Sequence, residues 1–254
     1  MIGAIDIVGT GPGSPDWIAP AARQAIEAAD VILGYRTYLG LLADIAPGTE
    51  RERSGMRDEV ARARRAIELA REGRRVALVS GGDAGVYGMA GLLLEVLAGD
   101  PEPDVPVAVL PGITALTAAA ALLGAPLMSD FAAISLSDHL TPLETLLARV
   151  DHAAQAGFVL CLYNPRSHRR TDPYRLACEI LLRHRAPETP CGVVRAAYRD
   201  KQEVRLVPLA DLAATEVGMD AIVVVGGPET RVLGGRLVTA RGYERKYDLE
   251  GGAA

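Results

Sequence analysis

Residues 2–16 have the sequence IGAIDIVGTGPGSPD, in which a short apolar run is followed at once by a turn rich in glycine and proline. The run from Ile2 to Val8 has the length of a buried strand. Residues 9–15 (GTGPGSP) end it, because glycine and proline interrupt regular structure and favour turns. A helical pattern follows from Asp16 to about Ala29, with Asp16 as its predicted N-cap. This order of elements is typical of α/β proteins with parallel strands.

The same alternation continues along the chain. Further strands are predicted over residues 31–34, 76–80, 105–110, 132–135, 157–162, 192–195, 203–207 and 221–225. Helices are predicted over residues 57–72, from 88 to 98, from 113 onward, over 142–155 and over 173–185. The pattern predicts an α/β fold of two α/β lobes with mixed, mostly parallel sheets. The N-terminal domain is predicted to span residues 1–112 and the C-terminal domain residues 113–245.

Composition indicates an ordinary soluble globular protein, with 49% apolar and 23% charged residues. The net charge of −5 argues against a nucleic-acid partner. The N-terminus does not resemble a signal peptide, and the chain lacks an apolar run of about 18 residues, so we expect no membrane partner and a cytoplasmic location. Three cysteines (161, 178 and 191) and four histidines lack metal-ligand spacing, so no metal is expected. Cys161 and Cys191 lie in apolar stretches and are predicted to be inert core thiols.

The glycines of the first turn allow a comparison with dinucleotide-binding proteins. Gly9, Gly11 and Gly13 form Gly-x-Gly-x-Gly, whereas the dinucleotide fingerprint is Gly-x-Gly-x-x-Gly. Its ribose-binding acid should lie at the end of the second strand, but Asp30 precedes that strand. A phosphate-binding P-loop is excluded, because no Gly-Lys-Ser/Thr follows. A tight turn without any ligand remains an alternative at this position.

The second turn, SGGDAGVY (residues 80–87), ends a strand with three glycines and one acid. Gly81, Gly82 and Gly85 allow close approach of the backbone to a ligand. Asp83 lies at the carboxyl end of a strand, where open α/β sheets bind ligands. A carboxylate suits a hydroxyl-rich or cationic ligand and would repel a phosphate. The alternative interpretation is that Asp83 only forms the turn or caps the next helix.

Four segments in a fixed order carry a family resemblance: GTGPGSPDWIA (9–19), SGGDAGVYG (80–88), LPGITALTAAAALLGAPL (110–127) and IVVVGG (222–227). Over residues 2–245 the chain resembles the tetrapyrrole (corrin/porphyrin) methylase family. Three more segments, GYRTYL (34–39), AISLSDHLTP (133–142) and LYNPRSHRR (162–170), resemble the branch that methylates precorrin-3B at carbon 17. One departure is Ala84, where the family usually has proline.

The resemblance implies that S-adenosylmethionine binds in a cleft between the two lobes, which holds the active site, and that the protein is a homodimer. The implied cofactor contacts are Pro12, Gly81, Gly82, Asp83, Val86, Thr114, Ala115, Tyr163, Asn164, Arg195, Ala196 and Ala197. This cofactor carries a sulfonium and an ammonium group and no phosphate. A carboxylate and backbone groups suit it better than a phosphate cradle at a helix end.

The branch resemblance further implies contraction of the macrocycle to precorrin-4, a step that needs a base and an acid. The catalytic candidates are Ser137, Asp138, His139 and Tyr35. The alternative for Ser137 and Asp138 is that they cap the helix beginning at Pro142. The tetrapyrrole substrate is rich in carboxylates, and the arginines predicted to bind them are Arg36, Arg166, Arg169 and Arg170. The arginines of the helix over residues 57–72 are interpreted as a solvated face.

Three other functions stay open from the sequence. Another methylase of the same fold would act on a different precorrin or on uroporphyrinogen III, a precursor of siroheme. A nicotinamide-dependent oxidoreductase would bind NAD(H) and not S-adenosylhomocysteine. A non-catalytic tetrapyrrole carrier would bind the macrocycle whatever residue stands at position 83.

Overall fold

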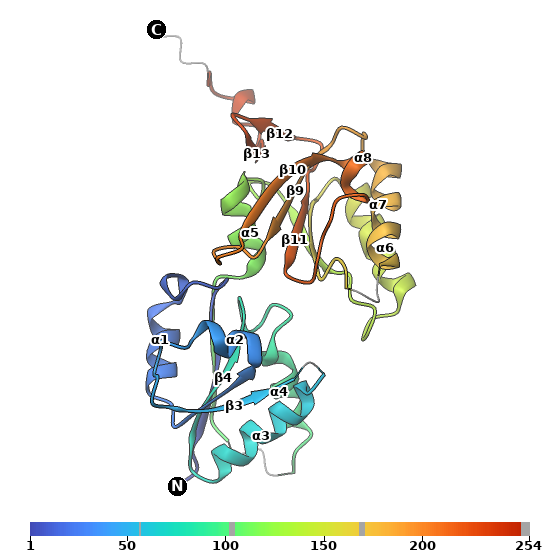
Figure 1. Ribbon diagram of the computed structural model, residues 1–254. Coiled ribbons are helices and arrows are strands. Elements are labelled where there is room, and N and C mark those ends of the chain that lie inside the picture. The colour runs from blue at the N-terminus through green and yellow to red at the C-terminus, as the bar shows by residue number, and fades with distance from the viewer. Residues whose placement is uncertain (56, 102–104, 168–170, 250–254) are drawn as a thin grey trace. The chain divides into compact units, whose positions relative to one another are not determined.

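A computed structural model describes residues 1–55, 57–101, 105–167 and 171–249. The chain forms two compact units, Met1–Ala118 and Ala119–Ala254, and each is built around its own sheet and helices (Figure 1). The boundary between them lies within the helix α5 (Ala115–Leu123). No helix formed by the described residues is both long enough and apolar enough to cross a membrane.

The first unit contains a five-stranded sheet. Its strands are β1 (Ala4–Gly9), β2 (Val31–Tyr35), β3 (Glu50–Ser54), β4 (Arg75–Ser80) and β5 (Val107–Leu110). They lie in the order β3-β2-β4-β1-β5, and every neighbouring pair is parallel. The carboxyl ends of all five strands therefore meet at one edge of the sheet. This edge carries both of the glycine-rich turns.

Helices cover both faces of this sheet. They are α1 (Pro20–Glu27), α2 (Arg36–Leu41), α3 (Glu59–Arg71) and α4 (Met89–Ala98), with a 3-10 turn, η1 (Pro15–Trp17), before α1. Side chains of α3 and α4 bury one face, together with Ile5, Leu33 and Leu78. Side chains of α1 and α2 bury the other face, together with Ile32 and Val79. Burial on both faces explains the nearly continuous apolar runs of the central strands.

The prediction that an α-helix begins at Asp16 is wrong for its first turn. Residues 15–17 form the short 3-10 turn, and α1 begins only at Pro20. Ser14, not Asp16, caps the 3-10 turn: its hydroxyl accepts a hydrogen bond of 3.3 Å from the Asp16 backbone N–H. Proline suits the first position of a helix, because it has no N–H to be left unpaired there.

The sequence ERERS of β3 was not predicted to be a strand, because it lacks the apolar residues by which strands are recognised. Its charges have partners in the folded unit. The Arg51 guanidinium donates to the backbone carbonyls of Leu39 and Leu42 at the end of α2. The Glu52 carboxylate accepts from Arg65 of α3. These contacts let a charged segment form the edge strand.

The second unit has a mixed sheet. Its strands are β7 (Phe131–Ser135), β8 (Val159–Tyr163), β9 (Pro190–Arg195), β10 (Glu203–Pro208) and β11 (Ala221–Val225). They lie in the order β10-β9-β11-β8-β7, with only β7 and β8 parallel. Its other elements are α6 (Leu143–Gln155), α7 (Asp172–His184), α8 (Leu209–Leu212), η2 (Tyr243–Arg245) and a small sheet of β6 (Gly124–Ala125), β12 (Thr230–Leu233) and β13 (Arg236–Thr239).

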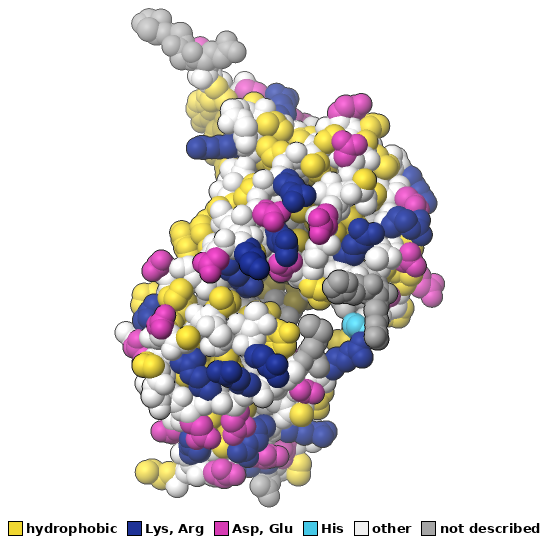
Figure 2. Space-filling view, in the orientation of Figure 1, with side chains coloured by type: hydrophobic (Ala, Val, Ile, Leu, Met, Phe, Trp, Pro, Cys, Tyr) yellow, Lys and Arg dark blue, Asp and Glu magenta, His cyan; other side chains and the backbone are white. Residues whose placement is uncertain are grey.

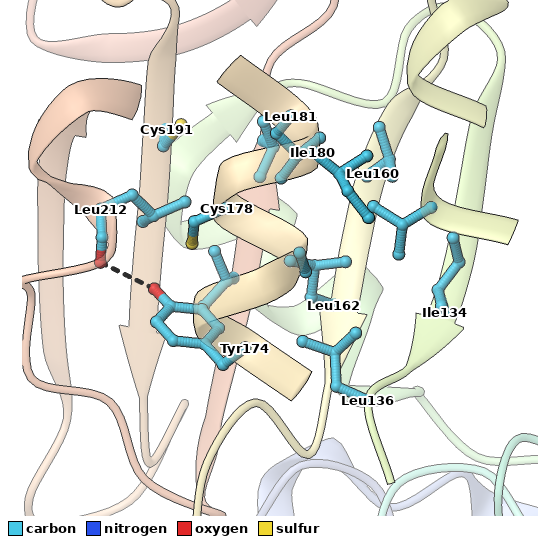
Figure 3. Packing of buried hydrophobic residues seen from close by; sticks show 14 of the residues in the cluster. Ile134, Leu136, Leu160, Leu162, Tyr174, Cys178, Ile180, Leu181, Cys191 and Leu212 are labelled. Carbon is cyan, nitrogen blue, oxygen red and sulfur yellow. Dashed lines mark hydrogen bonds between the residues drawn. The ribbon is translucent and has the colours of Figure 1, made fainter. Parts of the chain in front are cut away.

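One face of this sheet packs against α6 and α7, which lie side by side. Figure 3 shows Leu160 and Leu162 of β8 facing Leu181 of α7 in this core. The phenol of Tyr174 is buried there and donates a hydrogen bond of 2.9 Å to the Leu212 carbonyl (Figure 3). The bond satisfies the one polar group that this large side chain brings into the core.

The three cysteines are buried and unpaired. Burial raises the pKa of each thiol, Cys161, Cys178 and Cys191, to about 12. At pH 8 only about one thiol in ten thousand is then ionised, and the thiolate is the reactive form. We expect negligible reaction with Ellman's reagent in the native protein and three reactive thiols in denaturant. Rapid reaction of any one of them in the native state would contradict this assignment.

Candidate active site

The turns after β1 and β4 are joined by backbone hydrogen bonds. Gly11 N–H donates to the Gly82 carbonyl at 3.0 Å, and Gly82 N–H donates back at 2.7 Å. The φ angles of these two glycines are +73° and +70°, a region that other residues rarely adopt. Both the N–H and the hydroxyl of Thr10 donate to the Ser80 carbonyl, at 2.9 and 3.0 Å.

The turn after β5 packs against the same backbone. A Cβ atom on Gly112 would lie 2.7 Å from both the carbonyl carbon and the oxygen of Gly9, and closer still to the carbonyl oxygen of Gly82. A Cβ atom on Gly9 would lie 2.6 Å from the Gly112 nitrogen. No side chain fits between these segments. The three turns therefore form one backbone junction, made of residues 9–11, 81–83 and 112, at the carboxyl edge of the sheet.

The carboxylate of Asp83 holds this junction together. One oxygen, Oδ1, accepts a hydrogen bond of 2.8 Å from Gly85 N–H in its own turn. The other, Oδ2, accepts a bond of 2.9 Å from Gly112 N–H in the turn after β5. Asp83 therefore shapes its own turn and also joins it to the turn after β5, while its contact with a ligand stays a prediction. A carboxylate oxygen accepts up to two hydrogen bonds, so Asp83 retains acceptor capacity for a ligand.

Other predicted cofactor residues lie around this junction. A Cβ atom on Gly82 would lie 3.4 Å from the Ala115 nitrogen and 3.6 Å from Thr114 Cα, at the start of α5. Pro12 is buried in the first turn, and Val86 is half-buried in the second. The first unit thus brings all of its predicted cofactor residues to one edge of one sheet.

Tyr38 is a residue of this edge that the sequence did not single out. Its ring covers Gly81, where a Cβ atom would lie 2.7 Å from the ring carbon Cζ. The ring also makes an edge-to-face contact with Tyr35, with centroids 5.6 Å apart. Tyr35 ends β2, and Arg36 begins α2 with an exposed side chain. Its sequence signal was its place in the segment GYRTYL, which carries part of the family resemblance.

In the second unit, β7, β8 and β9 end at a common edge. The Asn164 side-chain amide donates to the Ser135 hydroxyl at 3.1 Å, and Ser137 N–H donates to the same hydroxyl at 3.3 Å. Asn164 has a φ of +50°, which asparagine tolerates better than most residues. Ser135 therefore links the loop that contains Ser137 to the turn after Tyr163, which is itself buried.

The capping alternative for Ser137 and Asp138 is wrong. The N-cap of α6 is Pro142, and no side chain caps that helix. Ser137 is half-buried, whereas Asp138 and His139 are exposed in the loop after β7. Their predicted roles in proton transfer stay predictions.

At the end of β9, Arg195 forms ion pairs with two acids. Its Nε lies 2.9 Å from Asp220 Oδ2, and its Nη1 lies 3.6 Å from Glu203 Oε1. Ala196 is buried with a φ of +46°, and its N–H donates to the Asp220 carbonyl at 3.0 Å. Ala197 follows and is half-buried. The Arg195 side chain is thus paired with two acids, and its predicted contact with the cofactor stays a prediction.

The arginines predicted to bind substrate have different environments. Arg166 is half-buried and lies near Cys178 of α7. Burial raises the pKa of the Cys178 thiol, and the positive charge of Arg166 offsets a smaller part of that rise. Arg169 and Arg170 lie outside the described residues. Among the residues that the structure describes, no group of three or more His, Cys, Asp or Glu side chains is placed to hold a metal ion.

The geometry does not fit a dinucleotide. Asp30 lies at the amino edge of the sheet, where its carboxylate accepts a hydrogen bond of 2.7 Å from Arg75 N–H. A ribose-binding acid would have to lie at the carboxyl edge. The first turn leads into η1 and not directly into an α-helix, so it lacks the helix N-terminus on which a pyrophosphate rests.

Comparisons with known proteins bear on these observations. A model of the family described as Tetrapyrrole (Corrin/Porphyrin) Methylases matches residues 4–213. A cobalt-factor III methyltransferase of Priestia megaterium is 47% identical over 98% of this chain, which spans 47% of that relative. A probable cobalt-factor III C(17)-methyltransferase of Salmonella typhimurium is 44% identical over 94% of this chain and 99% of its own length. A precorrin-3B C(17)-methyltransferase of Sinorhizobium is 40% identical over 92% of both.

Two solved structures of methyltransferases are also similar to this chain. The methyltransferase CobJ is 40% identical with a TM-score of 0.88, over 94% of this chain and 100% of that one. A uroporphyrin-III C-methyltransferase of Thermus thermophilus, crystallised with S-adenosylhomocysteine, is 27% identical with a TM-score of 0.69, over 88% of this chain and 97% of that one. The resemblance found in the sequence motifs is thus confirmed, and this chain belongs to the tetrapyrrole (corrin/porphyrin) methylase family.

Proposed function

We propose that this chain transfers a methyl group from S-adenosylmethionine to carbon 17 of precorrin-3B or of its cobalt-containing counterpart, cobalt-factor III, in cobalamin biosynthesis. The observation that carries the proposal is the backbone junction held by Asp83. It places an acid and close-packed backbone at the carboxyl edge of a sheet, in a chain of this family. The names of the 40–47% identical relatives support the choice of carbon 17.

The residues of the junction fit the chemistry of the cofactor. S-adenosylmethionine presents cations, ribose hydroxyls and a purine, and no phosphate. The Asp83 carboxylate accepts hydrogen bonds from hydroxyl or ammonium groups, and the exposed Gly85 beside it adds no side chain that would obstruct a ligand. Gly82, Asp83, Thr114 and Ala115 are proposed to hold the cofactor on this side. Tyr163, Asn164, Ala196 and Ala197 of the second unit are proposed to contact the same molecule.

When bound, the cofactor supplies an activated methyl group, so the protein's main task is to align donor and acceptor. Contraction of the ring additionally requires proton transfers. Ser137, Asp138, His139 and Tyr35 are the proposed groups. Ser135, which fixes the backbone of Ser137, gives this loop a defined position relative to Asn164. That shared anchor is the structural reason to retain the loop as the source of the acid or base.

Mass spectrometry of the products tests this function. The purified protein is incubated with S-adenosylmethionine and separately with cobalt-factor III, precorrin-3B and uroporphyrinogen III. We expect one added methyl group, at carbon 17, on one or both of the first two compounds and none on the third. The relatives of higher identity are named for cobalt-factor III, so we expect the faster reaction with the cobalt-containing compound. Methylation of uroporphyrinogen III alone would refute the choice of substrate.

Calorimetry separates the classes of function. We expect binding of S-adenosylhomocysteine and no binding of NAD(H). Tetrapyrrole binding without binding of S-adenosylhomocysteine would instead indicate a carrier. The homodimer and the cytoplasmic location stay predictions, which light scattering and cell fractionation test.

A further inference from the structure

Arg62 of α3 is a buried cation that the proposed reaction has not used. Only 7% of its surface is exposed. The sequence interpretation of the α3 arginines as a solvated face is therefore wrong for this residue. It lies on the same side of α3 as Ala63 and Ala66, which pack against the sheet. A charged group in this position needs partners, because its desolvation is costly.

The hydrogen-bond partners of Arg62 are all uncharged. Its Nε donates to the Ser54 hydroxyl and its Nη2 to the Gly55 carbonyl at 3.0 Å, both at the end of β3. Its Nη1 lies 3.4 Å from the sulfur of Met89, the first residue of α4. No carboxylate of the described residues lies within ion-pair distance of it. Burial accordingly lowers the pKa of this guanidinium, partly offset by the more distant charges of Glu59 and Asp58.

Arg62 lines a cavity of about 280 Å³ beside the carboxyl end of β3. The cavity is lined by Leu33, Glu52, Arg53, Ser54, Gly55, Asp58, Ala61, Arg62 and Arg65. Figure 2 shows Lys and Arg side chains gathered over the part of the molecule where Figure 1 places β3.

The acids of this cavity are already engaged. The Glu52 carboxylate accepts two or more hydrogen bonds from Arg65, and the Asp58 carboxylate accepts a bond of 2.8 Å from Gly55 N–H. Arg53 is exposed and makes no ion pair or side-chain hydrogen bond with any residue that the structure describes. Neither Arg53 nor Arg62 therefore forms an ion pair with the acids of the described residues, although the more distant charge of Asp58 acts on Arg62. Guanidinium groups bind carboxylates and phosphates bidentately, and the substrate of the proposed reaction presents carboxylates.

We propose that this cavity, the Arg53–Arg62 pocket, binds a carboxylate side chain of the tetrapyrrole substrate. The inference rests on the function proposed above. The pocket lies at the same sheet edge as Asp83, with β2 between β3 and β4. Neighbouring strands are about 4.8 Å apart, so the two sites are separated by roughly 10 Å along the edge. A macrocycle of four rings with acetate and propionate arms spans that distance.

The contact between Arg62 and Met89 connects the pocket to the second turn. Met89 N–H donates to the Ser80 hydroxyl at 3.1 Å, directly after the segment that carries Gly81 and Asp83. A carboxylate bound by Arg62 is thus held by a side chain that packs against the end of the cofactor turn. The pocket would position the macrocycle relative to the methyl donor.

Steady-state kinetics with Arg53→Ala tests the pocket. Loss of a charge-assisted bond should raise the KM for the tetrapyrrole roughly tenfold, while kcat and the affinity for S-adenosylhomocysteine change less than about twofold. Arg62→Lys keeps the charge but loses the planar fork, and we expect a similar rise in KM. Arg64→Ala is the matched control, because Arg64 is an exposed arginine of the same helix outside the pocket. It should leave all three constants unchanged.

Direct binding separates the failure of this inference from the failure of the proposed function. Binding of uroporphyrin III, which carries eight carboxylates, is followed by its fluorescence anisotropy. If the wild-type protein binds neither this probe nor cobalt-factor III, the proposed function itself fails. If the wild type binds but Arg53→Ala and folded Arg62→Lys bind equally well, the pocket assignment is overturned. Should Arg62→Lys not fold, Arg53→Ala decides alone, because its side chain is exposed.

Discussion

Asp83→Ala is expected to weaken the binding of S-adenosylhomocysteine by roughly tenfold to a hundredfold. Two effects combine. The variant removes the carboxylate proposed to accept hydrogen bonds from the cofactor, and it leaves the N–H groups of Gly85 and Gly112 without their acceptor. The Gly112 N–H lies in a partly buried site, where an unpaired donor costs about 1 kcal/mol or more, whereas water can replace the acceptor of the exposed Gly85 N–H; the free energy of unfolding should therefore also fall. Isothermal calorimetry and denaturant titration measure the two effects separately.

Asp83→Asn distinguishes a ligand role from a structural one. Asparagine keeps one oxygen, which can accept the hydrogen bond from Gly85 N–H. Its NH₂ group then faces the Gly112 N–H, which loses its acceptor, and the negative charge is removed. We expect this variant to regain part of the stability lost in Asp83→Ala and little of the cofactor affinity. Wild-type affinity in Asp83→Asn would mean that Asp83 only shapes the turn. Unchanged affinity in both variants would remove Asp83 from the cofactor site.

Gly112→Ala is expected to destabilise the first unit more than any other single methyl addition at this edge. The new Cβ would lie 2.7 Å from the Gly9 carbonyl carbon and oxygen, and nearer still to the Gly82 oxygen. All of these atoms belong to the backbone, so no side chain can turn aside to make room. Relief requires breaking the Gly11–Gly82 pair or the bond from Gly112 to Asp83. We expect a loss of about 3 kcal/mol or more in chemical denaturation, with loss of cofactor binding.

Gly91→Ala is the matched control for this substitution. Gly91 lies in α4, and a Cβ atom there would meet no other atom within 4 Å. Alanine is the better helix former by about 0.5–1 kcal/mol, so this variant should be as stable as the wild type or more so. Equal stability of Gly112→Ala and Gly91→Ala would show that the backbone junction is not as tightly packed as its distances indicate.

The alternation of strands and helices, and the turns where a functional site should be sought, can be read from the sequence alone. Apolar runs with turn residues at their ends identified β1, β2, β4 and β5, because the signals of a buried strand lie within the strand itself. The same local patterns placed Gly81, Gly82 and Asp83 at a strand's carboxyl end, where they are found. Their order along the chain also carried the family resemblance.

Charged segments were misread, because their partners are distant in the sequence. The strand β3 depends on Arg51 reaching the end of α2 and on Arg65 reaching Glu52. Arg62 is buried because residues of β3 and α4 contact its side chain. The periodicity of α3 does not predict these contacts. A hydrogen bond or ion pair between remote segments leaves no local pattern in the residues that make it.

The assembly of the site depends on the order in which the strands pair, which the sequence did not reveal. The strand order β4-β1-β5 brings Gly82, Gly9 and Gly112 into backbone contact, although they belong to three separate strand–turn segments. The same contact supplies Asp83 with its second hydrogen-bond donor, so that its carboxylate joins two turns at once. Close packing of remote backbone follows from the order in which strands pair, and that order depends on the energy of the whole folded unit and not on any one segment.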